Sequence, residues 1–268
     1  TVGATSLTFA SAFDGAFPVG SEVMPVRAAT LQSNVAQSRF LLNLQQNTFR
    51  FLVVDNEVSI ASTAAFSTFN SKVLLDGPNA VQGSSMSESV NREIFVVDNK
   101  TGAPVQFVDE DVSRKQSRKT FITNSRQALW ETRQLLHSLR GRQISFYLPT
   151  FQEEFDPLTD VVSVNDTIDV TNVGYTLSGQ NRAPKNVIRF TFADGTSLVR
   201  TIIGSSEVSS TIERLQVDST FGVSQVVADI VQIDFVEKVR LDTDRVVIEH
   251  RDGLGQAVIA APVRTVVE

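Results

Sequence analysis

Residues 124–149, reading NSRQALWETRQLLHSLRGRQISFYLP, predict a helix that is followed at once by an extended strand. Asn124 or Ser125 can cap the helix start, because a short polar side chain there accepts a hydrogen bond from an unpaired backbone N–H. Gly141 stands where a left-handed residue would end the helix. We therefore expect a helix from Ser125 to Arg140, in a chain otherwise dominated by short strand and turn patterns.

An apolar stripe along this helix indicates the side that faces a core, since its members recur at three- and four-residue steps. They are Ala128, Leu129, Thr132, Leu135, Leu136 and Leu139. After Gly141 the period falls to two, so alternate residues from Gln143 to Leu148 should lie on opposite sides of a strand. Pro149 ends that strand because it cannot donate a ladder hydrogen bond.

Two hairpins are predicted from turn residues between apolar runs. One joins residues 93–97 to 105–108 through a turn at 98–102, and the other joins residues 187–192 to 197–203 through Asp194-Gly195. A third hairpin is expected within residues 50–60, with its turn at Asp55-Asn56, and residues 39–45 favour a strand over a helical turn. Residues 77–91 are expected to form a surface loop.

The remaining segments are also read mainly as strands. Residues 207–215 predict a short helix. Strands are expected at residues 160–164, 167–173, 230–239, 246–250 and 257–267, with a turn at 251–255. The fold class is thus mainly β, with β-sandwich- or barrel-like domains and one substantial helix.

The chain of 268 residues is long enough for two domains. The acidic, irregular segment 151–157 favours a boundary there. We predict a β-rich assembly domain over residues 1–150, which includes the helix, and a β-sandwich-like domain over residues 151–268.

Composition disfavours several classes of function. There is no cysteine, so disulfides and thiolate chemistry are excluded. A net charge of −6 disfavours a specific nucleic-acid binder, and no apolar run approaches the length of a membrane span. The 18 Phe against 1 Trp and 2 Tyr indicate buried packing more than a sugar-binding surface.

Candidate catalytic groups are few. His137 and His250 are the only histidines, too few for a three-histidine zinc site, and no Gly-x-Ser-x-Gly motif occurs. The acidic pairs Glu153-Glu154 and Asp242 with Asp244 could suit a glycosidase, but neighbouring arginines favour turn caps or salt bridges for the second pair. We therefore expect no catalytic residue, cofactor or metal.

A basic cluster is the most distinctive charged feature. It comprises Arg114, Lys115, Arg118, Lys119 and Arg126, with Arg133, Arg140 and Arg142 further along. Such a cluster could contact nucleic acid, but the acidic net charge favours pairing with a neighbouring copy. Trp130 follows the apolar stripe and is expected in the core, with an intersubunit anchor as the alternative.

Two segments carry a family resemblance. Trp130, the Leu139–Arg142 turn and the strand Ser145–Thr150 resemble tail-tip or baseplate proteins of tailed bacteriophages. Val231–His250, with Arg240-Leu241-Asp242 leading into Asp244-Arg245, looks like the closing strands of the same kind of protein. The resemblance covers roughly a third of the chain, and distal tail or hub proteins are the nearest analogues.

The resemblance implies a non-enzymatic virion protein, made in the host cytoplasm, that forms a ring of three or six copies. Such a ring would join the tail tube to hub and fibre proteins. The expected interface residues are Arg114, Lys115, Arg118, Lys119, Trp130, Arg140 and Arg142. The alternatives are a receptor- or glycan-binding module, marked by an exposed aromatic platform, and a hydrolase, marked by an acid pair in one cleft.

Overall fold

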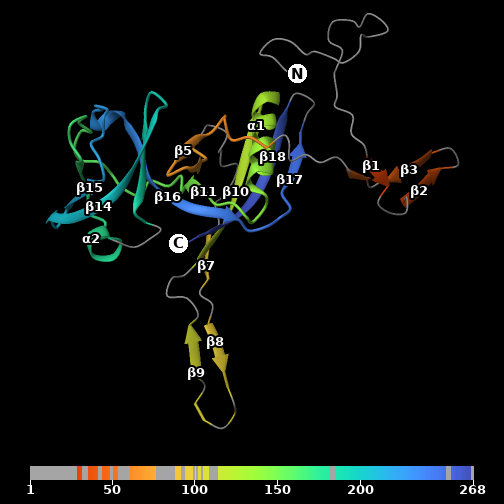
Figure 1. Cartoon of the computed structure of the whole chain (residues 1–268), viewed down its shortest axis with the longest axis horizontal. Coiled ribbons are helices and arrows are strands. Elements are labelled where there is room, and N and C mark those ends of the chain that lie inside the picture. The colour runs from red at the N-terminus through yellow and green to blue at the C-terminus, as the bar shows by residue number, and fades with distance from the viewer. Residues whose placement is uncertain are drawn as a thin grey trace, which may run out of the picture. The chain divides into compact units, whose positions relative to one another are not determined.

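A computed structural model describes residues 29–31, 36–41, 44–48, 51–53, 61–76, 88–91, 94–98, 100, 102–103, 105–108, 114–180, 185–251 and 255–266 (Figure 1). The chain divides into two compact units, Thr1–Glu57 and Val58–Glu268. The domain division that the sequence predicts at residue 150 stays a prediction.

The first unit contains two antiparallel strand pairs. Strand β1 (Ala29–Leu31) pairs with β4 (Phe51–Val53), and β2 (Ala36–Leu41) pairs with β3 (Leu44–Thr48). The single strand predicted at residues 39–45 is wrong: the segment holds the end of β2 and the start of β3, which run antiparallel and pair Leu41 with Leu44. Most of the hairpin predicted at residues 50–60 lies outside the described residues. The same holds for the loop predicted at 77–91, but its last residues form strand β7 (Glu88–Asn91), so that part of the loop prediction is wrong.

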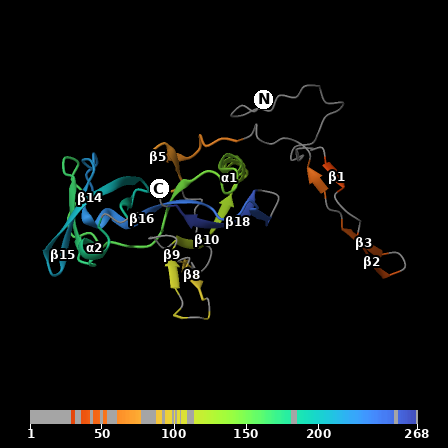
Figure 2. The same ribbon diagram turned by 60° about the horizontal axis from the view of Figure 1, so that its bottom comes forward.

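A 12-stranded sheet dominates the second unit (Figures 1 and 2). Its strands are β5 (Ser67–Phe69), β6 (Lys72–Leu74), β7 (Glu88–Asn91), β10 (Arg114–Asn124), β11 (Phe146–Pro149), β12 (Thr167–Thr171), β13 (Val187–Phe192), β14 (Ser197–Ser209), β15 (Ile212–Val217), β16 (Ile230–Leu241), β17 (Val247–His250) and β18 (Gln256–Thr265). The main path runs β12-β15-β14-β13-β16-β11-β6-β5, while β18 pairs with β16, β10 and β17, and β7 pairs with β10. The mainly β class with one substantial helix is confirmed.

Both hairpins predicted from turn residues are confirmed. Strands β8 (Ile94–Val97) and β9 (Val105–Val108) pair across a turn in which Asp98 accepts a hydrogen bond from the N–H of Lys100. Strands β13 and β14 pair across Asp194-Gly195, where Gly195 has a φ of +83°. Glycine suits this turn because a positive φ costs it little.

The long strand β16 connects two hydrophobic cores. Its first half pairs with β13, and its second half pairs with β11 and β18. A core that we call the β16 start core surrounds the first half, and its most buried members include Phe155, Ile168, Phe190, Leu215 and Ile233.

Glu213 of β15 is buried at the edge of the β16 start core and binds the start of helix α2 (Tyr175–Ser178). Its carboxylate accepts hydrogen bonds from the N–H groups of Val173, Tyr175 and Thr176 at 2.8 to 3.1 Å. These donors explain how a charged side chain in an alternating strand tolerates burial.

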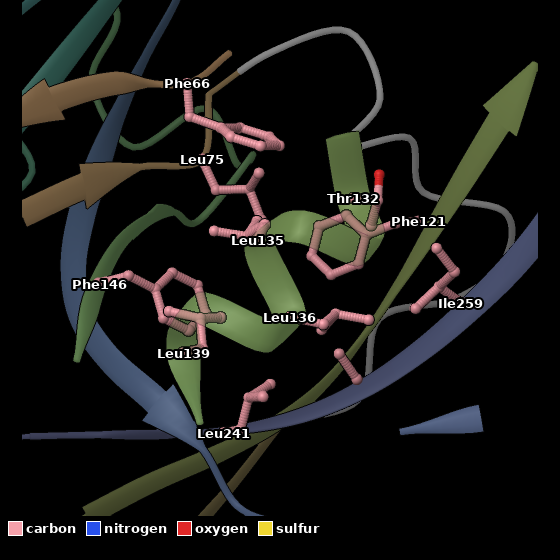
Figure 3. A pocket seen from close by; sticks show the side chains of 11 residues that line it. Phe66, Leu75, Phe121, Thr132, Leu135, Leu136, Leu139, Phe146, Leu241 and Ile259 are labelled. Atoms are coloured by element: carbon pink, nitrogen blue, oxygen red, sulfur yellow. The ribbon is translucent and has the colours of Figure 1, made fainter. Parts of the chain in front are cut away.

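Helix α1 (Arg126–Leu139) covers the second core, which we call the α1 core (Figure 3). Ser125 is the N-cap, with its hydroxyl accepting from the N–H of Ala128 at 3.1 Å, as one of the two predicted caps. The buried residues are Ala128, Leu129, Thr132, Leu135 and Leu139, which confirms the predicted stripe apart from half-buried Leu136. The left-handed residue that ends the helix is Arg140, with a φ of +49°, and Gly141 follows it at +62°.

Strand β11 lies between the α1 core and a third cluster. Phe146 and Leu148 belong to the α1 core, while Tyr147 packs with Leu74 and Val236, as alternation in a strand requires. The predicted alternation is therefore confirmed, but both faces are buried and the strand begins at Phe146.

Two further predictions of local structure are wrong. Residues 207–215 form no helix: β14 continues to Ser209 and β15 starts at Ile212. The segment forms strands and not a helix because Glu213, Leu215 and Val217 are buried in alternation against the sheet. Residues 160–164 contain only an isolated bridge, between Val161 and Gln225.

A buried ion pair links strands β13 and β16. Arg189 donates to both carboxylate oxygens of Asp234, at 3.0 and 2.7 Å. Asp234 also accepts from the N–H of Phe151, whose ring lies 5.0 Å from the Arg189 guanidinium, and Arg189 donates to the carbonyl of Asp76. Segments that follow β6 and β11 are thereby fixed to the centre of the sheet.

Candidate interaction surface

Strand β10 carries most of the predicted basic cluster, and its alternation divides that cluster between two faces of the sheet. The inner face is the one that α1 covers, and Phe121, Ile259 and Leu241 lie on it. Lys115 and Lys119 share this parity, whereas Gln116 and Arg118 face the other way. The side chain of Arg114 lies outside the described residues.

The inward lysines have partners within the chain. Lys115 forms an ion pair with Glu237 at 3.1 Å, and buried Lys119 donates to the carbonyl of Thr150 at 3.3 Å. Burial raises the pKa of nearby Glu154, although Lys185 and Lys115 act in the opposite direction. These groups stabilise the inner face, and the Lys119 amino group is not available at the surface of a single chain.

The outer face brings together basic residues that are far apart in the sequence. Gln116 of β10 lies opposite Arg264 of β18, which lies opposite Arg240 of β16. Arg118 is two residues from Gln116 on the same face and is exposed. With Lys238, these residues form what we call the basic face: Arg118, Lys238, Arg240 and Arg264.

Asp242 contacts the basic face. Its carboxylate lies 3.3 Å from Arg264 Nε and accepts from Gln116 Nε2. Within the part of the chain that the structure describes, Arg118 and Arg240 have no ion-pair partner. An open depression of about 270 Å³ lies here, lined by Gln116, Arg118 and Asp242 among others. Among the described residues, the face thus has two guanidinium groups without an ion-pair partner, beside an open depression.

The arginine-rich turn after α1, which contains Arg140 and Arg142, is separate from the basic face. Arg142 donates its backbone N–H to Asp244 Oδ1 at 3.0 Å, and its side chain lies 3.9 Å from the same carboxylate. A side chain at Gly141 would overlap Asp244, so a glycine is required at this close approach. Arg140 and Arg142 are both exposed.

Trp130 lies on α1 and is 42% exposed, so its predicted place in the core is wrong. The helical stripe places its neighbour Leu129 in the core and leaves Trp130 at the edge. The predicted interface residues with described side chains therefore lie at the inner face, the outer face, the turn after α1 and the exposed side of α1.

Sequence reasoning missed the members of the basic face on β16 and β18. Arg240 lies between buried Val239 and Leu241, which is a signal that it faces away from the core. Arg264 lies in the same way between buried Val263 and Thr265. That signal could not place them beside Arg118, because the strand pairing is non-local.

Three of the candidate catalytic side chains lie close to arginines. His250 Nε2 is 3.4 Å from Arg133 Nη2, and Asp242 and Asp244 contact arginines as described above. No three His, Asp or Glu side chains gather into a potential metal site within the described ranges.

A cavity of about 30 Å³ lies between α1 and the sheet (Figure 3). Its lining is apolar, with side chains such as Leu135, Phe146 and Leu241 pointing into it. The hydroxyl of Thr132 donates to the carbonyl of Ala128 at 2.7 Å and has its hydrogen bond within the helix. The cavity is a packing gap in the α1 core and presents no group suited to catalysis.

None of the helices that the structure describes has the length and apolar character needed to cross a membrane. No model of a known protein family matches the chain, and no curated protein is significantly similar to it in sequence.

Proposed function

We propose that this chain is a non-enzymatic structural protein of the tail tip or baseplate of a tailed bacteriophage. Copies form a ring of three or six that joins the tail tube to hub or fibre proteins. The chain belongs, in this proposal, to the virion tail and is made in the host cytoplasm.

The main support for the proposal is that the two segments that resemble such proteins pack against each other in one core. Leu139 and Phe146 come from the first segment, and Val239 and Leu241 come from the second. All four belong to the α1 core, so segments that are far apart in the sequence form one packed unit. A shared core supports reading both resemblances as parts of the same kind of domain.

The alternative, a receptor- or glycan-binding module, lacks a comparable supporting observation. Its mark would be a platform of exposed aromatic side chains beside polar loops. Trp130 is the one large aromatic residue that is exposed in the described ranges. We therefore keep the assembly function as the proposal.

Location in the particle tests the proposed function. Gold-labelled antibody against the chain should bind the tail end of purified phage particles that carry it, as seen by electron microscopy. Particles from which the chain is missing, or label confined to the head, would contradict the proposal.

The turn after α1 provides a second test. Replacing Arg140 and Arg142 by Glu should block assembly, because two exposed cations become anions at the predicted interface. Circular dichroism and size-exclusion chromatography should show a folded monomer. The matched control is K100E/R251E, which makes the same change in net charge at two other exposed positions. Normal assembly of the Arg140 and Arg142 variant would remove this turn from the interface.

A further inference from the structure

Charge is distributed unevenly along the chain. Residues 151–235 contain twelve Asp and Glu against five Lys and Arg, a net charge of −7, while the whole chain carries −6. The rest of the chain is therefore close to neutral and includes the basic face. We call residues 151–235 the acidic region, and the basic face lies outside it.

Three exposed acids mark one end of the acidic region. Asp160 accepts from the N–H of Val227 at 2.8 Å, and the carbonyl of Asp229 accepts from the N–H of Ala193, beside Asp194. Among the described residues, none of these acids has a cationic partner. We call Asp160, Asp194 and Asp229 the acidic end.

Strand β16 separates the acidic end from the basic face. Asp229 immediately precedes the strand and Arg240 lies near its far end, so the strand holds them roughly 35 Å apart at ~3.3 Å per residue. Figures 1 and 2 both show β16 running from the side of β14 and β15 towards β18. At physiological ionic strength the screening length is about 8 Å, so the two regions cannot neutralise each other within one copy.

We infer that the basic face of one copy binds the acidic end of a second copy, head to tail. This inference rests on the proposed function, in which copies assemble, and names the surfaces that meet. A contact between two different patches is heterologous, and it closes into a ring when the rotation between copies allows. The unpaired Arg118 and Arg240 would gain carboxylate partners beside the open depression.

A second copy fits this face better than a nucleic acid does. Each copy carries the complementary anions at the opposite end of the same strand, whereas a long polyanion would also meet the repulsion of a molecule with net charge −6. A second copy of the chain is thus the partner that we infer for the basic face. Binding of DNA to this face is the alternative that the experiment tests.

Two variants of the full chain separate the surfaces. The basic-face variant is R118E/R240E, with R118Q/R240Q as its milder form. The acidic-end variant is D194N/D229K, because asparagine keeps the oxygen through which Asp194 accepts hydrogen bonds from Thr196. Circular dichroism establishes that each is folded, and K100E/R251E is the control of matched charge change for R118E/R240E.

Sedimentation at several protein and salt concentrations measures self-association. The wild-type chain should associate, more weakly at high salt, and each variant alone should raise the dissociation constant roughly tenfold or more. The R118Q/R240Q form should have an intermediate effect, and the control should behave as the wild type does.

Mixing the two variants is the decisive step. The basic-face variant retains a native acidic end and the acidic-end variant retains a native basic face, so the mixture should regain association in pairs. If the wild type assembles but the mixture stays monomeric, the head-to-tail contact is overturned while the proposed function stands. If the wild type never assembles, both fail.

Labelled double-stranded DNA tests the other occupant. The wild type should not bind it measurably at physiological salt. DNA binding that is lost in R118E/R240E, in a protein that does not self-associate, would overturn the inference in favour of a polyanion site.

Discussion

Arg189 and Asp234 are charged residues at the centre of the sheet, and their side chains are 5% and 0% exposed. Two hydrogen bonds join the two side chains directly. Asp234 also accepts from the N–H of Phe151, and Arg189 also donates to the carbonyl of Asp76. Taking both charges out of water is costly, so the pair fixes the geometry of the segments it joins more than it adds net stability.

Breaking this pair should be strongly destabilising. Asp234→Ala leaves the Arg189 guanidinium buried without its carboxylate, and we expect a loss of about 3–5 kcal/mol in the free energy of unfolding. Urea unfolding measures it. Asp169→Ala is the control, since it breaks the exposed pair with Arg214, which is shorter at 2.6 Å. Its loss should be much smaller, and equal losses would show that burial does not set the cost.

Glu213 predicts a pH dependence. Burial raises the pKa of its carboxyl, but the N–H groups of Thr176, Val173 and Tyr175 outweigh burial and hold the pKa below its ordinary value of 4.5. A carboxyl with a lowered folded pKa contributes stability above pH 4.5 that is lost as the pH falls through the folded pKa. The stability gap between the wild type and Glu213→Gln should therefore be largest near neutral pH and shrink below pH 4.5.

Urea unfolding of both proteins from pH 3 to pH 7 follows this gap. Glu207→Gln is the control, since Glu207 is exposed at the end of β14 and should change stability little at any pH. A gap for Glu213→Gln that is constant across the range would show that ionisation of Glu213 is not linked to folding.

These buried charges could not be predicted from the sequence. Glu213 and Asp234 lie in strands whose patterns also suit surface residues, and their partners are 37 to 83 residues away. Local patterning predicts to which face of the sheet a strand residue points, but it does not predict which hydrogen-bond donors lie on that face.

At the scale of elements, helix α1 and its start depend on a glycine far along the chain. Gly255 has a φ of +100°, and a methyl group there would overlap the backbone of Ser125 and Arg126. The carbonyl of Gly255 also accepts from the hydroxyl of Thr123 at 2.9 Å. The end of β10 and the helix cap are thus packed against the start of β18.

Gly255→Ala should therefore destabilise the protein more than Gly195→Ala does. Both glycines have positive φ, and the strained backbone alone should cost roughly 1–3 kcal/mol. A side chain at Gly195 meets nothing within 4 Å, whereas one at Gly255 must displace the helix start. Thermal unfolding of the two variants gives the comparison, and equal losses would contradict close packing at Gly255.

Elements with strong local signals were the ones that the sequence predicted well. Helix α1 has a cap, an apolar stripe and a left-handed end, and the β13–β14 hairpin has Asp194-Gly195 at its turn. The short helix predicted at residues 207–215 failed because β14 and β15 pair as a hairpin around a turn at 210–211, and this pairing overrides the helical preference of the segment.

At the scale of the whole molecule, the order of strands brings distant residues onto shared faces. Strand β10 pairs with β18, which lies more than 100 residues further along the chain. No periodicity in the sequence specifies that pairing, so the basic cluster could be predicted only as a local run of cations. The structure divides that run between an inner face, where lysines contact residues of the chain, and the basic face.

Assembly is the central claim about the whole molecule, and electron microscopy of the purified chain with mass determination over a range of concentrations tests it most directly. We expect closed rings of three or six copies at high concentration, because exposed charged surfaces of a mainly β subunit would then be paired between copies. A particle mass that remains that of a single chain at every concentration, even with candidate tube and fibre proteins added, would contradict the account.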